Sequence, residues 1–386
     1  MKSILITKRF VLQLICISCV FALLQCSKSE FSDEENHPVV PFFDYSSVAF
    51  IARITYNSAD WSLCAIDKSG NGMRKIVDKT VACQKPIRSH SGTKLLFTVV
   101  KFDHWNDENN TFHSSYEYEL YIVNIDGTGL TLIDRIDPTA DGRFGGVAWS
   151  PDDSQIVYVR WYYHYSVDPY WDETNLILFN ISDNTRTILQ TEGNVCSPKF
   201  SPDGKHIAYC TLVENGHHIY KMNVSENTNQ VIISNASSPS WSPQGNKITY
   251  LSSGKEGSSQ IFVANADGSN QKQLTSTISP RRWPGWPPDG NSDPQWTPDG
   301  KKIVYVSYEN EKSEIFIMNA DGSKKTQLTK AELMDEHPEV TPDGKHILFV
   351  SRISGNMTDG GISVMSLNGK NQRVLHRTGY NPVACR

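Results

Sequence analysis

Three stretches of this sequence combine aromatic rings with charged groups more densely than the rest of the chain, namely 101–119, 160–174 and 277–292. Indole rings stack on the C–H faces of sugars, and Trp, Tyr and Arg also dominate protein interfaces. A third interpretation is that the stretches pack on one another as a lid. The candidate ligand- or partner-binding residues are Trp105, Trp161, Tyr163, Trp171, Arg281, Arg282, Trp283 and Trp286.

A second group of polar residues lies beside Pro294 and Pro338, and it consists of Asp293, Asp335, Glu336 and His337. Histidines and carboxylates that converge at one site can hold a metal or transfer protons. However, the sequence has no G-x-S-x-G, no H-E-x-x-H and no glycine-rich phosphate loop. We therefore assign no catalytic residue, no metal and no cofactor.

The elements that must position these residues form a repeat. Residues 292–329 contain four short β-signals, joined by a Thr-Pro-Asp-Gly turn at 297–300 and an Asp-Gly turn at 321–322. Such turns between β-branched runs indicate hairpins, and four antiparallel strands in about 40 residues make one propeller blade. The first turn recurs at residues 150, 201, 242 and 341, with a worn copy at 89.

These turns resemble the Pro-Asp repeats of TolB-type β-propellers, from about residue 48 to the C-terminus. The resemblance implies the fold and leaves the function open, because no separate N-terminal domain of the TolB kind precedes the repeats. Residues 46–78 form a blade that lacks a first strand, and Asn381-Pro382-Val383-Ala384 matches the missing strand. We therefore expect an all-β, seven-bladed propeller closed by the C-terminal strand, with six blades as the alternative.

Strand alternation predicts which end of the propeller carries each stretch. The Pro-Asp-Gly turns share one end, which we call the turn face. The connections between second and third strands, and those between blades, share the other end, which we call the loop face. All three aromatic stretches are predicted on the loop face, as long loops. The residues Trp149, Phe200, Trp241, Trp296 and Val340 repeat at one position and should pack between blades.

Residues 1–25 resemble a signal peptide, because Lys2, Lys8 and Arg9 precede an apolar run too short to span a bilayer comfortably. The run ends at Cys26 in a sequence that resembles a lipobox, and an acidic tether follows. We expect a signal peptide at 1–25, a lipidated tether at 26–45 and the propeller at 46–386. Loss of the signal takes the net charge from −5 to −8, which argues against nucleic-acid binding.

Of the eight cysteines, Cys16 and Cys19 leave with the signal peptide and Cys26 takes the lipid, so five remain. The chain is predicted to enter an oxidising compartment, where these five can form disulfides. If Phe200 faces His206 in its hairpin, Cys196 faces Cys210, within reach of a disulfide. Two buried thiols are the alternative. Cys64, Cys83 and Cys385 are left, and either of the first two is a candidate to pair with Cys385.

The sequence thus predicts non-catalytic recognition at the bacterial cell envelope, with a protein or a glycan bound at the loop face. The alternative is a carbohydrate-active enzyme, lyase-like or hydrolase-like, with a metal at the channel mouth. Oligogalacturonate lyases, which are Pro-Asp-repeat propellers with such a metal, resemble this arrangement, but their His/Gln signature is missing from this sequence. The expected location is the outer membrane, on its periplasmic side or at the cell surface. The membrane is contacted through the lipid anchor alone.

Overall fold

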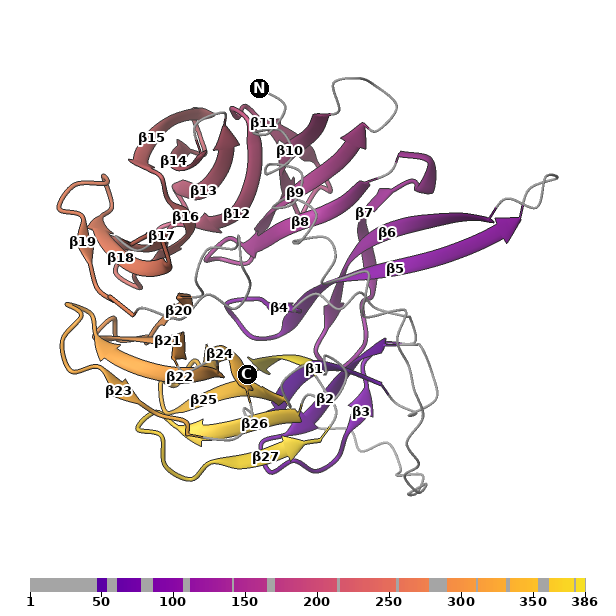
Figure 1. Ribbon diagram of the computed structural model, residues 1–386. Coiled ribbons are helices and arrows are strands. Elements are labelled where there is room, and N and C mark those ends of the chain that lie inside the picture. Colours follow the sequence, from indigo (N-terminus) through magenta and orange to yellow (C-terminus); the bar gives the residue numbers. More distant parts are fainter. Residues whose placement is uncertain are drawn as a thin grey trace.

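Seven four-stranded antiparallel sheets stand around a ring, so the molecule is a seven-bladed β-propeller (Figure 1). The computed structural model describes residues 47–53, 61–77, 86–106, 112–140, 142–164, 171–213, 216–254, 257–277, 290–309, 312–330, 334–352, 361–377 and 380–385. Within these ranges, no helix is both long enough and apolar enough to cross a membrane. The predicted signal peptide, Cys26 and the tether lie outside the described residues.

The blades follow one another along the chain, each with its first strand innermost (Figure 1). Blade 1 is β28 (Tyr380–Cys385), β1 (Ser47–Arg53), β2 (Trp61–Asp67) and β3 (Arg74–Lys75). Blade 2 is β4 (Ile87–Arg88), β5 (Lys94–Asn106), β6 (Phe112–Asn124) and β7 (Thr131–Ile136), followed by a short 3-10 turn, η2 (Pro138–Ala140). Blade 3 is β8 (Gly142–Trp149), β9 (Gln155–His164), β10 (Trp171–Asn180) and β11 (Arg186–Leu189).

Blade 4 is β12 (Asn194–Phe200), β13 (His206–Val213), β14 (Gly216–Asn223) and β15 (Thr228–Ser234). Blade 5 is β16 (Ser237–Trp241), β17 (Lys247–Ser253), β18 (Ser259–Asn265) and β19 (Lys272–Gln273). Blade 6 is β20 (Asn291–Trp296), β21 (Lys302–Glu309), β22 (Lys312–Asn319) and β23 (Thr326–Gln327). Blade 7 is β24 (Met334–Val340), β25 (His346–Arg352), β26 (Gly361–Ser366) and β27 (Arg373–His376).

The ring closes as predicted, because β28 pairs with β1 and so completes the first blade with the last strand of the chain. Without β28, the inner edge of β1 would lack a hydrogen-bonded neighbour, and such open strand edges favour aggregation. The apolar core is divided among the seams between blades rather than gathered in one place. One such cluster joins Val48 and Phe50 of blade 1 to Leu348 and Val350 of blade 7.

Each Pro-Asp-Gly turn is held by its own side chains. In the turn before β13, the Ser201 hydroxyl donates to Asp203 at 2.5 Å and accepts from the backbone N–H of His206 at 3.0 Å. Gly204 closes the turn with φ +70°, a conformation that costs glycine little. The same hydroxyl–carboxylate pair recurs as Thr297–Asp299 and Thr341–Asp343, both at 2.6 Å. The repeat seen in the sequence is therefore a repeated hydrogen-bond motif.

The repeated aromatic position is buried, as predicted. Trp149, Trp241 and Trp296 are 2%, 9% and 9% exposed. Each indole N–H reaches into the preceding blade: Trp241 donates to the Lys199 carbonyl at 3.1 Å, and Trp296 donates to Oγ1 of Thr249 at 3.1 Å. These rings therefore pack in the contacts between blades, which we call seams, and they are buried core residues.

A bulge shifts the register at one equivalent place in six of the inner strands. In blades 4 to 7 the bulge carries a residue that precedes proline and has a positive φ of 50° to 53°; these residues are Ser197, Ser238, Asp293 and His337. The bulge corrects our predicted register in blade 4. Phe200 faces Ile207 rather than His206, yet Cys196 still faces Cys210, because the bulge adds one residue to β12.

Candidate functional site on the loop face

Two blades carry hairpins that extend well past their neighbours. β5 and β6 have 13 residues each, and β9 and β10 have 10 each. Pairing of β6 with β7 ends at Tyr118, so the rest of the β5–β6 hairpin leaves the blade as a two-stranded arm (Figure 1). Our prediction of long loops at 101–119 and 160–174 was therefore wrong, since both stretches are largely strand. The physical reason is their aromatic content, which favours continued cross-strand pairing.

Charged side chains fix the base of the β5–β6 arm. Nζ of Lys101 lies 2.8 Å from Glu119 and 3.1 Å from Glu117. Arg135 of β7 contacts the same two carboxylates at 3.3 and 3.0 Å, and the Tyr121 hydroxyl donates to Glu119 at 2.9 Å. Such a network orients the arm relative to its blade, although its exposed pairs add little stability.

An aromatic cluster lies on the inner strands of blade 3. The Arg143 guanidinium lies 5.4 Å from the ring centroid of Trp161 and 5.7 Å from that of Tyr163. The two rings are 6.4 Å apart, and all three residues are partly exposed. Two predicted binding residues are thus brought together, and sequence reasoning missed their cationic partner. We call Arg143, Trp161 and Tyr163 the aromatic cluster.

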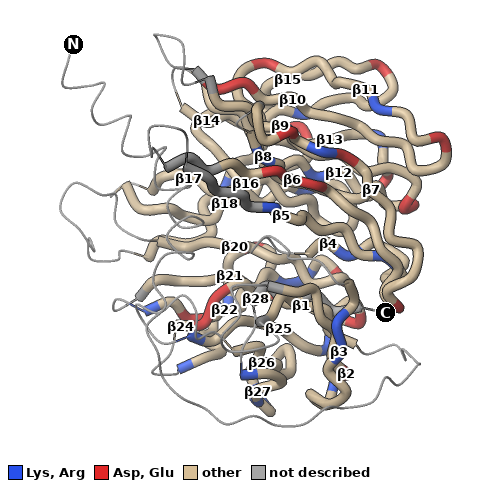
Figure 2. Tube along the Cα trace, turned by 90° about the vertical axis from the view of Figure 1, so that its right-hand side faces the viewer, with Lys and Arg blue, Asp and Glu red and all other residues tan. Residues whose placement is uncertain are grey.

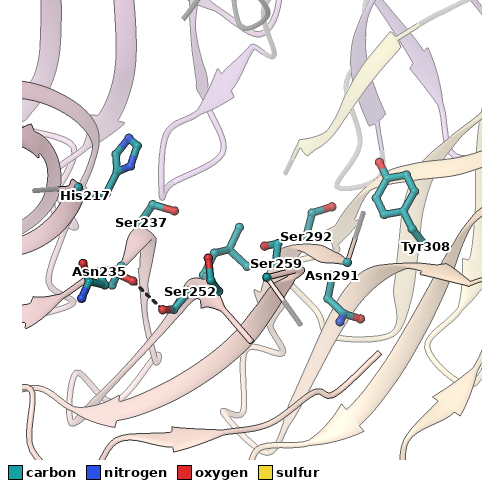
Figure 3. Close-up of a pocket in the computed structure, with 14 residues that line it drawn as sticks. His217, Asn235, Ser237, Ser252, Ser259, Asn291, Ser292 and Tyr308 are labelled. Carbon is teal, nitrogen blue, oxygen red and sulfur yellow. Dashed lines mark hydrogen bonds between the residues drawn. The ribbon is translucent and has the colours of Figure 1, made fainter. Parts of the chain in front are cut away.

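A cavity of about 590 Å³ lies where blades 4, 5 and 6 meet at the loop face. His217 and Tyr308 stand on opposite sides of it, with Ser237, Ser259 and Ser292 between them (Figure 3). Ser252 donates to the Asn235 carbonyl at 2.6 Å along its wall. Among the described residues that line it there is no Asp, Glu, Lys or Arg. The cavity therefore suits an uncharged polar group, and no signal in the sequence predicted it.

The four polar residues predicted at the channel mouth fall into two settings. Asp293 and His337 are half exposed on neighbouring inner strands, with Nδ1 of His337 3.3 Å from Oδ2 of Asp293. Asp335 and Glu336 are 0% and 6% exposed in the seam between blades 6 and 7. Glu336 pairs with Arg352 at 2.6 Å and accepts from the Ser313 hydroxyl at 3.2 Å.

Burial, together with the charges of Glu314 and Glu336, raises the pKa of Asp335 to about 6. The hydroxyl of Ser351, which donates to Oδ1 of Asp335, and the nearby hydroxyl of Thr329 lower the same pKa without compensating for the burial. Within the described ranges, no three His, Cys, Asp or Glu side chains gather as a metal site would require.

The remaining predicted site residues are only partly placed. Trp105 lies on β5 and Trp171 is the first residue of β10. Arg281, Arg282, Trp283 and Trp286 lie outside the described residues. Cys196 and Cys210 are both free thiols, and their hydrogen bond holds the pKa of Cys196 below its usual value and that of Cys210 above it. The disulfide itself stays a prediction.

In the side view, Lys and Arg positions and Asp and Glu positions are both scattered along the chain trace (Figure 2). Nucleic-acid binding usually needs a basic face or groove. The distinctive features of the loop face are the aromatic cluster, the β5–β6 arm and the uncharged cavity.

Several known proteins are similar to this chain. The Tol-Pal system protein TolB of Francisella tularensis subsp. tularensis is 32% identical over 220 residues, which are 55% of this chain and 45% of that protein. The crystal structure of TolB from Acinetobacter baumannii superposes with a TM-score of 0.51 at 18% identity, over 88% of this chain and 82% of the other. An oligogalacturonate lyase from Vibrio parahaemolyticus gives 0.54 at 14% identity, over 86% and 87%.

Both structural similarities show the fold alone, given their low identity. The matching region spans less than half the length of the curated relatives. The family model for the TolB β-propeller domain matches residues 105–379, which is well over half of the chain. Together with the seven closed blades, this match shows that the chain belongs to the TolB β-propeller family.

Proposed function

We propose that this chain is a non-catalytic recognition propeller of the bacterial cell envelope, and that it binds a protein partner through the loop face. The aromatic cluster is the observation that carries the proposal. Trp, Tyr and Arg are the residue types that dominate binding energy at protein interfaces, especially where rings are partly covered. Here a guanidinium already lies over two rings, so little side-chain freedom is lost on binding.

Two further observations support a protein partner. The relatives at 32% identity bear the name of an envelope assembly, the Tol-Pal system. The β5–β6 arm projects from its blade, and a two-stranded arm offers both side chains and strand edges to a partner. Anchoring of the chain at the outer membrane through Cys26 belongs to the same proposal, because it would hold the loop face near other envelope proteins.

The proposal is tested by placing a photo-crosslinking amino acid at Tyr163 in cells that make this protein. A second chain carries the same amino acid at Ile188, which is 65% exposed on the outer strand of the same blade. We expect position 163 to yield one discrete envelope-protein adduct that position 188 does not. The adduct should weaken when Trp161→Ala is added. A glycan adduct at 163, or equal adducts from both positions, would contradict the proposal.

A further inference from the structure

Two neighbouring seams of the propeller place buried polar side chains at equivalent positions. Between blades 5 and 6, Oε1 of Gln260 accepts from Nδ2 of Asn291 and from Oγ1 of Thr275, both at 2.9 Å. The Thr275 hydroxyl in turn accepts the backbone N–H of Ile261 at 2.9 Å. All three side chains are at most 2% exposed. The contact between the two blades is therefore an amide pair with a threonine beside it.

Between blades 6 and 7, carboxyl groups replace both amides. Asn291 lies opposite Ser307, and Asp335 lies opposite Ser351, so Asp335 occupies the place of Asn291 in the next blade. Glu314 occupies the place of Gln260: Thr329 donates to Glu314 at 2.5 Å and accepts the backbone N–H of Ile315 at 3.0 Å. The backbone and threonine geometry is thus retained while both amides become acids.

This replacement removes a donor. In the amide pair, the N–H₂ group of Asn291 makes the contact with Gln260, whereas an ionised carboxylate has no hydrogen to donate. Ser351 satisfies Oδ1 of Asp335 at 2.6 Å. Oδ2 is buried and has no hydrogen-bond partner in the described part of the chain. Two ionised carboxylates side by side in a dry seam would repel strongly.

We propose that Glu314 and Asp335 form a proton-binding site, in which one proton held on Asp335 is donated to Glu314 and closes the seam between blades 6 and 7. Asp335 takes the proton from water and forms an O–H bond, and the carboxylate of Glu314 accepts a hydrogen bond from that O–H. Release of the proton leaves two facing anions and loosens the seam.

The other polar and charged groups around Glu314 and Asp335 are an ion pair and several hydroxyls. Glu336 on the same strand is paired with Arg352 of β25, so its charge is largely compensated. Thr329, Ser351 and Ser363 contribute hydroxyls. The Tyr308 hydroxyl of β21 lies 3.5 Å from Oε1 of Glu336, and Tyr308 lines the loop-face cavity. Opening of the seam would therefore reach the wall of that cavity.

The direction of the pH dependence follows from the pKa of Asp335, which burial raises to about 6. An unfolded aspartate titrates near about 4, so between these values the folded protein binds more protons than the unfolded chain. The stability that the site contributes is full below about pH 4. It is lost as the pH rises through about 6.

The test compares the wild type with the double variant Glu314→Gln, Asp335→Asn, which recreates the amide pair of the neighbouring seam. From about pH 5 to about pH 8, we expect the thermal midpoint of the wild type to fall by a few degrees relative to the double variant. The reverse double variant, Gln260→Glu with Asn291→Asp, should gain a second dependence of the same sign. No partner is needed, so this inference stands apart from the proposed function.

Infrared spectroscopy gives a readout that does not depend on the folding of any variant. The carbonyl stretch of a protonated carboxylic acid should be present in the wild type near pH 5 and disappear as the pH rises through about 6. The band should be absent from the amide double variant at the same pH. Parallel midpoint profiles for wild type and double variant, or no acid carbonyl band lost over this range, would overturn the proposal.

Discussion

Nδ1 of His337 in blade 7 lies 3.3 Å from Oδ2 of Asp293 in blade 6, and both residues hold a positive φ, of 53° and 50°. A non-glycine residue in this region is strained by roughly 1–3 kcal/mol. The half-exposed ion pair returns little of that energy. The backbone strain at these two residues therefore lies in the innermost strands, where blades 6 and 7 meet.

Substitution at His337 should separate strain from pairing. Glycine adopts this backbone conformation freely, so His337→Gly should leave the free energy of unfolding unchanged or raise it slightly. His337→Val should lower it by about 1–3 kcal/mol, since a β-branched side chain tolerates a positive φ poorly. Urea denaturation of both variants checks this. Equal stabilities for the two variants would show that the backbone is not strained at this position.

Asp134 joins blades 2 and 3 and should be among the least replaceable charges in the propeller. It is 6% exposed, accepts from the Tyr158 hydroxyl and from Nε of Arg160, both at 2.7 Å, and receives a second bond from the same guanidinium. Asp134→Ala should cost about 3–5 kcal/mol, because Arg160 and Tyr158 keep their burial and lose their acceptor. Calorimetry checks this value.

The matched control is Asp137→Ala, three residues further along the chain. The Asp137 carboxylate is exposed and accepts hydrogen bonds from the hydroxyl and the backbone N–H of Thr139. Its loss should leave the midpoint nearly unchanged. Similar losses for the two variants would mean that the Asp134–Arg160 contact between blades is not what stabilises this seam.

The cysteine pair gives a prediction about oxidation state. Cys196 and Cys210 face each other on β12 and β13, and thiol–disulfide exchange with an oxidised dithiol protein of the envelope would join them while that protein is reduced. A loop this short gives about 3 kcal/mol of stabilisation. Mass spectrometry of acid-quenched, alkylated protein should find the two residues linked. Full alkylation of both without a reductant would contradict the disulfide.

Much of the fold could be predicted from the sequence, because each blade repeats its own local chemistry. The turn at Ser201 and the indole of Trp296 each mark one blade position. Asn381 and Pro382 identified the closing strand for the same reason. The bulge was not predicted. The sequence nevertheless carries a signal for it, because the bulged residue precedes a proline in each of four blades, at Ser197, Ser238, Asp293 and His337.

The candidate site was harder to predict, because its parts come from different strands. Trp161 and Tyr163 stood out by composition, whereas Arg143 lies in a glycine-rich strand without any unusual feature and meets them only through the pairing of β8 with β9. Gln260 and Glu314 are unremarkable alone. Their equivalence appears only when two seams are superposed, and a seam is a contact between blades that no local pattern encodes.

The most direct test of recognition through the loop face is amide hydrogen exchange, measured on the free protein and on the complex with its crosslinked partner. Binding slows exchange where backbone is covered. We predict protection in β5 and β6, in β9 and β10, and along the cavity at 251–253, 257–259 and 290–292, with none at the turns that contain Asp203, Asp299 and Asp343. Protection concentrated at those turns, or along the outer strands, would contradict the account.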